Sequence, residues 1–293
     1  MIVVGADVGG TSSRVVVFDD DTERARVEGP GGPMRVGQGE RLAASLAELA
    51  RPLLARGRTV RADTLVVGAS GAGREAEREE LQIALEQQRL AWRVIVTTDG
   101  ELARAAAFGS EPGVLLIAGT GSIAVSRDSR GTRRRVGGLG WRMGDQGSAY
   151  WIGAHALEAV GAMHDGLGAA TRLAESLCTA ARVAGIAGLV QWSTKASPAQ
   201  VAALAPVVLA TADGGDPVAA RVRDAAVDAL AQLALSAGDG KLPVAMSGGL
   251  LAPGRPLRDA LTAALQTEHG IAVVARAVDP CRGAPVLALE AAS

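Results

Sequence analysis

The sequence predicts a mixed α/β protein with two related lobes, and three observations support this prediction. Apolar runs typical of buried strands alternate with stretches of helical periodicity along residues 1–112. A buried strand, a glycine–hydroxyl turn and a returning strand occur around residues 2–18 and again around residues 114–125. The chain has 293 residues, 48% of them hydrophobic, which is enough for two modest cores. Repetition at about domain length indicates two related lobes and not a solenoid.

The first lobe is expected to begin with a hairpin and to continue with alternating helices and strands. The hairpin strands are apolar and are followed by the polar turn Asp19-Asp20-Asp21. Leucines at helical spacing predict the first helix, and a charged run predicts the second. The expected elements are, in order, strands 2–7 and 15–18, helix 40–56, strand 64–68, helix 74–90 and strand 94–96.

The second lobe is expected to repeat the hairpin before a long helical region. Glycine pairs should interrupt that helical region. The expected elements are strands 114–117 and 123–125, helices over most of 145–238 with breaks near Gly185–Gly188 and Gly214–Gly215, strand 244–246, helix 256–267, strand 271–275 and a short terminal helix. We place the first lobe at residues 1–112 and the nucleotide-binding second lobe at 113–282, with the terminal helix 283–293 packing back on the first lobe.

Charge and cysteine content argue against several classes of protein. Thirty basic and 31 acidic residues give a net charge of −1, so we expect neither nucleic acid nor a membrane as a partner. The run Arg133–Arg135 is expected to be a solvated hairpin tip. Cys178 and Cys281 lie far apart without CxxC spacing, which argues against a disulfide framework or a zinc site. Without a basic leader or an apolar run of about 18 residues, the chain is expected to be cytoplasmic.

Two glycine–hydroxyl turns in matching positions predict phosphate-binding loops. Gly9-Gly10-Thr11 and Gly119-Thr120-Gly121-Ser122 both follow a strand, and Ser247-Gly248-Gly249 follows a third. Glycine lets backbone amides approach an anion, and hydroxyl groups add donors. One such turn alone is often only a hairpin turn, so the repetition carries the prediction. The P-loop and the Rossmann fingerprint do not fit, because neither Lys195 nor Lys241 completes a P-loop and the hairpin turns open onto strands.

Two aspartates at strand ends are candidate functional residues. Asp7 ends the first strand, where it is placed to hold a Mg²⁺ ion that neutralises phosphates, directly or through water. A turn-capping aspartate is the structural alternative. Asp99, in TTDGEL, follows a strand and precedes an alanine-rich helix. It is either the N-cap of that helix or a base that accepts a proton from a substrate hydroxyl.

The stretch GGLGWRMGDQGSAYWIG, residues 137–153, combines glycines and one acid with three of the seven aromatic residues of the chain. Its first glycines suit a backbone that runs close to a ligand. Asp145 lies at the turn where this loop enters a helix that begins near Ser148. Tyr150 and Trp151 are expected to pack inside the lobe, whereas Trp141 is expected to border the site.

Taken in this order, the motifs resemble the superfamily of actin, hexokinase and heat-shock-chaperone ATPases. The stretch ending in GDQGSAYWIG looks like the GDxGSAYWI signature of the BadF/BadG/BcrA/BcrD ATPase family, in its N-acetylglucosamine kinase-like branch. The resemblance extends over essentially the whole chain. It implies an α/β fold with two ribonuclease H-like lobes, as in the actin-like ATPases, and an active-site cleft between the lobes.

The resemblance also implies an activity and roles for residues. It implies an ATP-dependent kinase, using ATP and Mg²⁺, that phosphorylates the 6-hydroxyl of an amino sugar such as N-acetylglucosamine or glucosamine, and it implies a homodimer. Asp99 is the expected catalytic base, and Asp7 is the expected metal residue. The expected sugar-binding residues are Gly138, Leu139, Gly140, Trp141 and Asp145. The expected nucleotide-binding residues are Gly9, Gly10, Thr11, Gly119, Thr120, Gly121, Ser122, Ala212, Gly248 and Gly249.

Two departures from the family pattern leave the sugar open. Gly32 stands where the family often has an asparagine that hydrogen-bonds the sugar, and Leu139 stands where the family has a tryptophan. Losing a polar contact changes discrimination between sugars strongly, by ~10⁴ in favourable cases.

Two alternative functions stay open. The same family contains ATPase activators of radical acyl-CoA dehydratases and ATPase subunits of benzoyl-CoA reductase. The activators hold an iron–sulfur cluster between two subunits, and the absence of a paired cluster motif favours the kinase. A sugar- or ATP-binding regulator without turnover is the other alternative, and the presence of Asp99 favours an enzyme.

Overall fold

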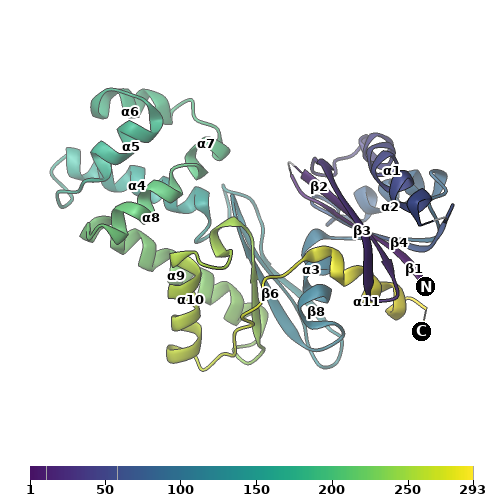
Figure 1. Ribbon diagram of the computed structural model, residues 1–293. Coiled ribbons are helices and arrows are strands. Elements are labelled where there is room, and N and C mark those ends of the chain that lie inside the picture. The colour runs from purple at the N-terminus through teal and green to yellow at the C-terminus, as the bar shows by residue number, and fades with distance from the viewer. Residues whose placement is uncertain (11, 58, 293) are drawn as a thin grey trace. The chain divides into compact units, whose positions relative to one another are not determined.

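A computed structural model of the protein describes residues 1–10, 12–57 and 59–292 and contains two sheets, one in each of two units (Figure 1). Unit 1 comprises Met1–Glu111 and Val278–Ser293, and unit 2 comprises Pro112–Ala277. The mixed α/β class predicted from the sequence is confirmed. Residues 278–282 belong to unit 1 and not to the expected second lobe, because Asp279 forms an ion pair with Arg26 of unit 1.

Unit 1, within its described residues, is built on a five-stranded sheet of order β3-β2-β1-β4-β5. Strands β1, β4 and β5 are parallel, whereas β1–β2 and β2–β3 are antiparallel pairs. The carboxyl ends of β1, β4 and β5 therefore share one edge of the sheet, where β2 begins and β3 ends. The elements are β1 (Ile2–Val8), β2 (Ser12–Asp19), β3 (Thr22–Pro30), α1 (Gly39–Arg56), β4 (Ala62–Ala69), α2 (Glu75–Gln87), β5 (Ala91–Thr97), α3 (Asp99–Phe108), the 3₁₀ turn η3 (Pro280–Arg282) and α11 (Gly283–Glu290).

Helices cover both faces of the unit 1 sheet because successive residues of a buried strand point to opposite sides. Val4 of β1 packs in one cluster with residues of α1 and α2. Val3 packs in another cluster with Leu102 of α3 and Leu287 of α11. The chain's C-terminal helix thus completes the core of unit 1. It approaches α3 closely at Gly283, where a Cβ atom would lie 2.0 Å from the carbonyl oxygen of Leu102.

Unit 2 repeats the strand arrangement of unit 1 and adds a helical region. The described sheet has the order β8-β7-β6-β9, in which β6 and β9 are parallel and the other pairs antiparallel. This repetition explains the two similar hairpins in the sequence. The elements are β6 (Gly113–Ala118), β7 (Ser122–Arg127), β8 (Arg133–Gly137), α4 (Ala149–His164), α5 (Leu173–Ala181), α6 (Gly185–Ser193), α7 (Pro198–Ala202), α8 (Ala205–Asp213), α9 (Pro217–Ala237), β9 (Val244–Ser247), the 3₁₀ turn η1 (Gly249–Leu251), α10 (Pro256–Ala263) and the π-helical turn η2 (Ala264–Glu268).

Some sequence predictions for unit 2 are wrong. The arginine run at 133–135 begins the edge strand β8 instead of a hairpin tip, because Arg133–Arg135 pair with residues 125–127 of β7. The strand expected at 271–275 is reduced to one bridge between Val273 and Val244. The break expected at Gly185–Gly188 lies earlier, since α6 begins at Gly185. No single helix in the described ranges is long and apolar enough to cross a membrane, although two bent helix pairs reach that length and composition.

A buried arginine fixes the end of α3 in unit 1. Arg104 is fully buried, with its Nε 3.3 Å from Glu101 Oε1 and two of its nitrogens 3.3 Å from the carbonyl oxygen of Gly109. Replacing Arg104 with methionine should lower the free energy of unfolding by about 3 kcal/mol, because the buried carboxylate of Glu101 and the carbonyl of Gly109 each lose a hydrogen bond from a buried guanidinium. Urea denaturation measures this, with Arg56→Met at the end of α1 as an exposed control. Equal losses in the two variants would contradict the structural role of Arg104.

Candidate functional site

Asp7 and Asp99 both lie at the carboxyl-end edge of the unit 1 sheet. Asp7 is the penultimate residue of β1 and pairs in register with Arg14 of β2. Asp99 begins α3 directly after β5. Thr98 is the N-cap of α3, since its hydroxyl accepts the amide of Glu101 at 3.1 Å. Helix capping therefore does not account for Asp99, whose carboxylate accepts the amide of Gly100 at 2.9 Å.

Ionisation of the Asp7 carboxyl costs more free energy in the folded chain than in water. The pKa of Asp7 is raised from its ordinary value of 3.8 to about 6. Burial is the main cause, and the negative charges of Asp99 and Asp279 add to it, whereas Arg14 opposes it. An acid of this kind, at the end of a parallel strand and beside a second acid, is typical of a functional site.

Asp7, Asp99 and Asp279 form an acidic group, in which Asp279 was not predicted from the sequence. Asp279 accepts a hydrogen bond from Arg26 at 2.5 Å and lies 4.0 Å from Arg14. Arg14 in turn donates to Glu28 at 2.9 Å. Asp279 also accepts the amide of Cys281 at 3.3 Å, as an N-cap. The Asp-Pro dipeptide before a short helical turn signals such a cap, but nothing local in the sequence indicates its proximity to Asp7.

The acidic group suits a hard divalent cation that is shared with a ligand. Among the described residues, no group of three or more His, Cys, Asp or Glu side chains is arranged to hold a metal ion by itself. Mg²⁺ commonly uses only one or two carboxylates, with waters and phosphate oxygens completing its shell. The raised pKa of Asp7 fits such an ion, because a neighbouring positive charge would favour the carboxylate.

The two cysteines are buried in different units. Cys281 is completely buried in unit 1, and burial raises the pKa of its thiol to about 12, with Asp7 and Asp279 adding to the effect. Its thiol donates to the carbonyl oxygen of Arg14 at 3.6 Å. Cys178 belongs to unit 2 and is also buried. A thiol with so high a pKa is a poor source of the thiolate that a cluster requires.

The first glycine turn, in unit 1, leaves open space over its backbone. Gly9 donates its amide to the carbonyl oxygen of Ser12 at 2.9 Å. No atom lies within 4 Å of the position that a Cβ on Gly10 would take. The fold itself therefore does not require glycine at position 10. Thr11, expected to contact the nucleotide, lies outside the described residues.

In unit 2 the second and third glycine turns meet on one cavity of about 520 Å³. Gly119 and Thr120 line it from the β6–β7 turn, and Gly249 lines it from η1. As at Gly10, no atom lies within 4 Å of a Cβ placed on Gly119 or Gly249. The volume falls in the range of about 300–1,000 Å³ that is typical of small-molecule sites. The remaining lining residues are Ala149, Ala202, Ala203, Pro206, Leu209, Ala210, Asp213, Leu250, Arg255, Pro256 and Leu257.

Most of that cavity wall is apolar, and two of its polar side chains, Asp213 and Arg255, were not predicted from the sequence. Asp213 ends α8, and Arg255 precedes α10; both are exposed and line the cavity. The pair Gly214–Gly215 marks the end of a helix at Asp213, but the position of Asp213 beside the β6–β7 turn depends on packing between distant elements. The cavity can therefore hold a flat apolar ring system near polar groups at its rim.

Asp145 lies beside the β6–β7 turn and not on an open surface. It is 8% exposed, adopts a left-handed backbone conformation with φ 60°, and accepts the amide of Ser122 at 3.3 Å. Burial raises the pKa of Asp145, and the amide of Ser122 opposes the shift. Gly121 makes room for this carboxylate, since a Cβ there would lie 2.8 Å from Asp145 Oδ1. The structure thus joins Asp145 to the phosphate-type turn.

Three residues expected to contact the nucleotide also have structural roles. The Ser122 hydroxyl is buried and donates to the carbonyl oxygen of Gln146 at 2.7 Å. Gly248 has φ 93°, and a Cβ there would lie 2.3 Å from the carbonyl oxygen of Ala118, so the turn itself requires glycine. Ala212 is 5% exposed and packs in the unit 2 core. Its helix neighbours Leu209, Ala210 and Asp213 line the cavity in its place.

The segment expected to run along the sugar is an exposed loop of unit 2. Leu139 and Trp141 are exposed, by 64% and 41% respectively. Gly138 and Gly140 have φ values of 66° and 84°, which favour glycine, and Arg135 donates to the carbonyl oxygen of Gly138 at 2.6 Å. The loop therefore exposes its backbone and apolar side chains, and the hydrogen bond from Arg135 holds its first residues.

Of the rings next to this loop, Tyr150 and Trp151 pack inside unit 2, as expected from the sequence. Ser148 is the N-cap of α4, where its hydroxyl accepts the amide of Trp151. Tyr150 and Trp151 are partly buried against the unit 2 core. Trp141 stays exposed, with its ring centroid 5.3 Å from that of Tyr150.

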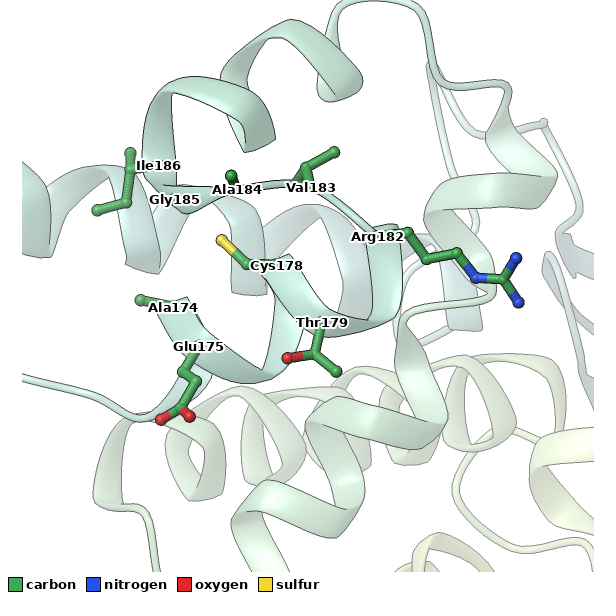
Figure 2. A pocket seen from close by; sticks show the side chains of 9 residues that line it. All are labelled: Ala174, Glu175, Cys178, Thr179, Arg182, Val183, Ala184, Gly185 and Ile186. Carbon is green, nitrogen blue, oxygen red and sulfur yellow. The ribbon is translucent and has the colours of Figure 1, made fainter.

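A further open cavity of about 530 Å³ lies between α5 and α6 (Figure 2). Figure 2 shows Cys178 pointing toward the segment 183–186, whereas Glu175 and Arg182 point away from it. This cavity contains none of the candidate site residues, so the cavity at the glycine turns is the better candidate for a ligand site in unit 2.

Comparison with known proteins identifies a family and several relatives of the chain. The model of the BadF/BadG/BcrA/BcrD ATPase family matches residues 4–288. An N-acetylmuramic acid/N-acetylglucosamine kinase from Clostridium acetobutylicum is 29% identical over 161 residues, which are 54% of this chain and 52% of that protein. The chain thus matches about half the length of this curated relative.

Solved structures share the fold over nearly the full length. A protein from Chromobacterium violaceum assigned as an N-acetylglucosamine kinase is 28% identical, with a TM-score of 0.79 over 98% of both chains. A ROK family glucokinase from Streptomyces griseus, in complex with glucose and AMPPNP, is 15% identical, with a TM-score of 0.57 over 99% of both chains. The second likeness shows the fold alone, which is that of the two-lobed sugar kinases.

Proposed function

Because the chain belongs to the BadF/BadG/BcrA/BcrD ATPase family, we propose that it is an ATP-dependent sugar kinase that phosphorylates the 6-hydroxyl of an amino sugar. The observation that carries the proposal is the unit 2 cavity, on which two glycine turns leave their backbone uncovered. The names of the relatives from Clostridium acetobutylicum and Chromobacterium violaceum support N-acetylglucosamine as the first sugar to test.

In this proposal unit 2 binds ATP. The apolar wall of the cavity receives the base. The backbone amide of Thr120 binds phosphate oxygens, because the amide of Gly119 already donates to the carbonyl oxygen of Gly121 at 2.9 Å. Glycine at 119 and 249 leaves the space that a phosphate needs to approach the amides. Asp145 positions the β6–β7 turn through its hydrogen bond with the amide of Ser122.

Asp99 acts as the catalytic base. It orients the sugar 6-hydroxyl and accepts its proton as the oxygen attacks the γ-phosphorus of ATP and ADP leaves. Phosphoryl transfer needs little covalent help from a protein, so most of the catalytic effect comes from alignment and charge neutralisation. Support for this role comes from the strand-end position of Asp99 and from Thr98, which already caps α3.

Asp7 is the carboxylate that we assign to Mg²⁺. The ion would neutralise phosphate charge when bound. Asp7 has the chemistry of a Mg²⁺ ligand, and its raised pKa shows that the folded chain holds negative charge there without a full counter-charge. Arg14 offsets part of this charge from the neighbouring strand.

An ATP-coupled assay of the purified protein against N-acetylglucosamine, glucosamine, N-acetylmuramic acid and glucose tests the proposal. We expect sugar-dependent ADP formation with at least one amino sugar and less with glucose. ADP formation that is absent, or that does not depend on any sugar, would contradict a sugar kinase. Absent ADP formation would favour the regulator, whereas sugar-independent ADP formation would favour a plain ATPase.

A pair of glycine substitutions separates ligand contact from folding. Gly119→Ala should leave the free energy of unfolding within about 0.5 kcal/mol of the wild-type value, because its Cβ meets no atom, yet weaken MgATP binding about tenfold or more. Gly121→Ala should lower the free energy of unfolding by about 1–3 kcal/mol, because its Cβ would meet the Asp145 carboxylate. Urea denaturation and MgATP calorimetry measure both, and unchanged MgATP binding by Gly119→Ala would contradict the phosphate role.

The iron–sulfur activator is the second candidate function, and the burial and raised thiol pKa of Cys281 disfavour it. Anaerobic purification followed by iron determination and absorbance spectroscopy decides between them. We expect no stoichiometric iron, and a bound cluster would reverse the ranking.

A further inference from the structure

A smaller cavity of about 210 Å³ lies in unit 1, between the loop that follows β3 and the first turns of α1. The loop starts where β3 ends, at the sheet edge that also carries Asp7 and Asp99. It then returns to the end of β4, where the amide of Met34 donates to the carbonyl oxygen of Ser70 at 2.7 Å. The cavity therefore opens beside the edge at which the proposed function puts the sugar. Its lining residues are Pro30, Gly31, Gly32, Pro33, Gln38, Arg41, Leu42 and Ser45.

Arg41 brings a positive charge to this cavity without a carboxylate to neutralise it. It donates one hydrogen bond, at 3.2 Å, to the neutral amide oxygen of Gln38. In the part of the chain that the structure describes, no carboxylate oxygen lies within ion-pair distance of Arg41. By contrast, Arg14 of the same unit is paired with Glu28. The guanidinium is thus available to an anion from outside the chain.

The backbone amides at the start of α1 are not available to bind an anion in the cavity, because they already donate to Glu80 of α2. Glu80 accepts the amides of Gly37 and Gly39 at 2.9 and 2.7 Å, and these bonds lower the pKa of its carboxyl. An anion in the cavity would therefore be bound by side chains. Gln38 and Ser45 provide neutral donors next to Arg41.

Gly32 leaves the cavity open. No atom lies within 4 Å of a Cβ placed on Gly32, whereas a Cβ on Gly31 would lie 2.4 Å from the backbone of Ser12. The fold thus requires glycine at 31 but not at 32. The cavity is smaller than the roughly 300–1,000 Å³ of sites that hold a whole small molecule, so it suits one substituent of a ligand.

We propose that this cavity binds an anionic substituent of the sugar substrate, a carboxylate or a phosphate, with Arg41 as its ion-pair partner. The inference rests on the proposed kinase function and adds a specificity-determining residue to it. A planar guanidinium binds both kinds of anion through paired hydrogen bonds. A neutral sugar has no group that forms an ion pair with Arg41, so water fills the cavity when such a sugar binds.

Kinetics with three sugars and one variant test the proposal. The sugars are N-acetylglucosamine, N-acetylmuramic acid with its carboxylate on the 3-oxygen, and N-acetylglucosamine 1-phosphate. We expect the wild-type protein to prefer one of the two anionic sugars, and the preferred one identifies the source of the anion. Arg41→Gln should lower kcat/KM for that sugar by ~10- to 100-fold and leave N-acetylglucosamine within about twofold.

Three further variants make the test specific. Arg56→Gln, at the far end of α1, is the matched control and should leave kcat/KM unchanged for all three sugars. Arg41→Lys keeps the charge and should recover part of the lost efficiency. Gly32→Asn should fold normally, because its side chain has space, and should reduce use of the anionic sugar by narrowing the cavity.

Calorimetric binding of each sugar without ATP separates this inference from the kinase proposal. If no sugar is phosphorylated but an anionic sugar binds and Arg41→Gln weakens it about tenfold or more, the kinase proposal fails and the anion site stands. If wild-type protein does not prefer either anionic sugar, or if Arg41→Gln weakens all three sugars equally, the anion site is overturned.

Discussion

Replacing Asp99 with asparagine is expected to lower kcat by about 10²–10⁴ while MgATP binding stays nearly unchanged. The amide keeps the size of the side chain and can still accept the amide of Gly100, which Asp99 accepts at 2.9 Å, but it cannot take the proton of the sugar hydroxyl. Thr98 continues to cap α3, so stability should change by less than about 0.5 kcal/mol. Steady-state kinetics, calorimetry with MgATP and urea denaturation measure the three quantities.

Asp21→Asn, in the polar turn between β2 and β3, is the matched control for removal of a negative charge in unit 1. It should keep wild-type kinetics. An Asp99→Asn protein with near-wild-type turnover would show that another group accepts the proton. A variant that loses turnover and stability together would point to a structural role for Asp99.

Replacing Asp7 with asparagine is expected to make the protein more stable and less active. The shift in the pKa of Asp7 from 3.8 to about 6 corresponds to about 3 kcal/mol, an upper limit because the side chain keeps some solvent contact. We expect a gain of about 1–2 kcal/mol in the free energy of unfolding at pH 8 without metal. We also expect kcat/KM for MgATP to fall by about 10²-fold, because a carboxylate at the phosphates is lost.

The gain in the free energy of unfolding from Asp7→Asn should depend on pH. Because the folded-state pKa of Asp7 is raised, the folded chain binds more protons than the unfolded chain between pH of about 4 and 6. The contribution of Asp7 to stability is therefore lost as the pH rises through this window. The gain from Asp7→Asn should be present at pH 8 and nearly absent at pH 4. A gain that does not change with pH, or a loss at pH 8, would contradict this account.

Local patterns in the sequence were sufficient for the two hairpins and their turns. Apolar strands on both sides of Gly9-Gly10 and Gly119-Thr120 determine the hairpins through nearest-neighbour pairing. The repeated strand order of the two units follows from the same pattern. The strand expected at 271–275 failed because its apolar residues make only one bridge, between Val273 and Val244, beside β9.

Residues of the candidate site that depend on distant packing were not predictable in the same way. Ser122 and Asp145 are 23 positions apart, and no local pattern predicts the hydrogen bond that the Ser122 amide donates to the Asp145 carboxylate. Ala212 shows the effect of helix phase: adjacent helix positions differ by about 100°, so Asp213 faces the cavity while Ala212 faces the core. Asp279 reaches the Asp7 group only through the return of the chain to unit 1.

The most direct test of the central claim is identification of the product by nuclear magnetic resonance. Protein, MgATP and N-acetylglucosamine, or the anionic sugar that the kinetics favour, are incubated together and followed by phosphorus and carbon spectra. The account predicts ADP and a sugar phosphomonoester whose phosphorus couples to carbon 6, and Asp99→Asn protein should not form it at a comparable rate. ADP with inorganic phosphate alone, or phosphate on another sugar oxygen, would contradict the account.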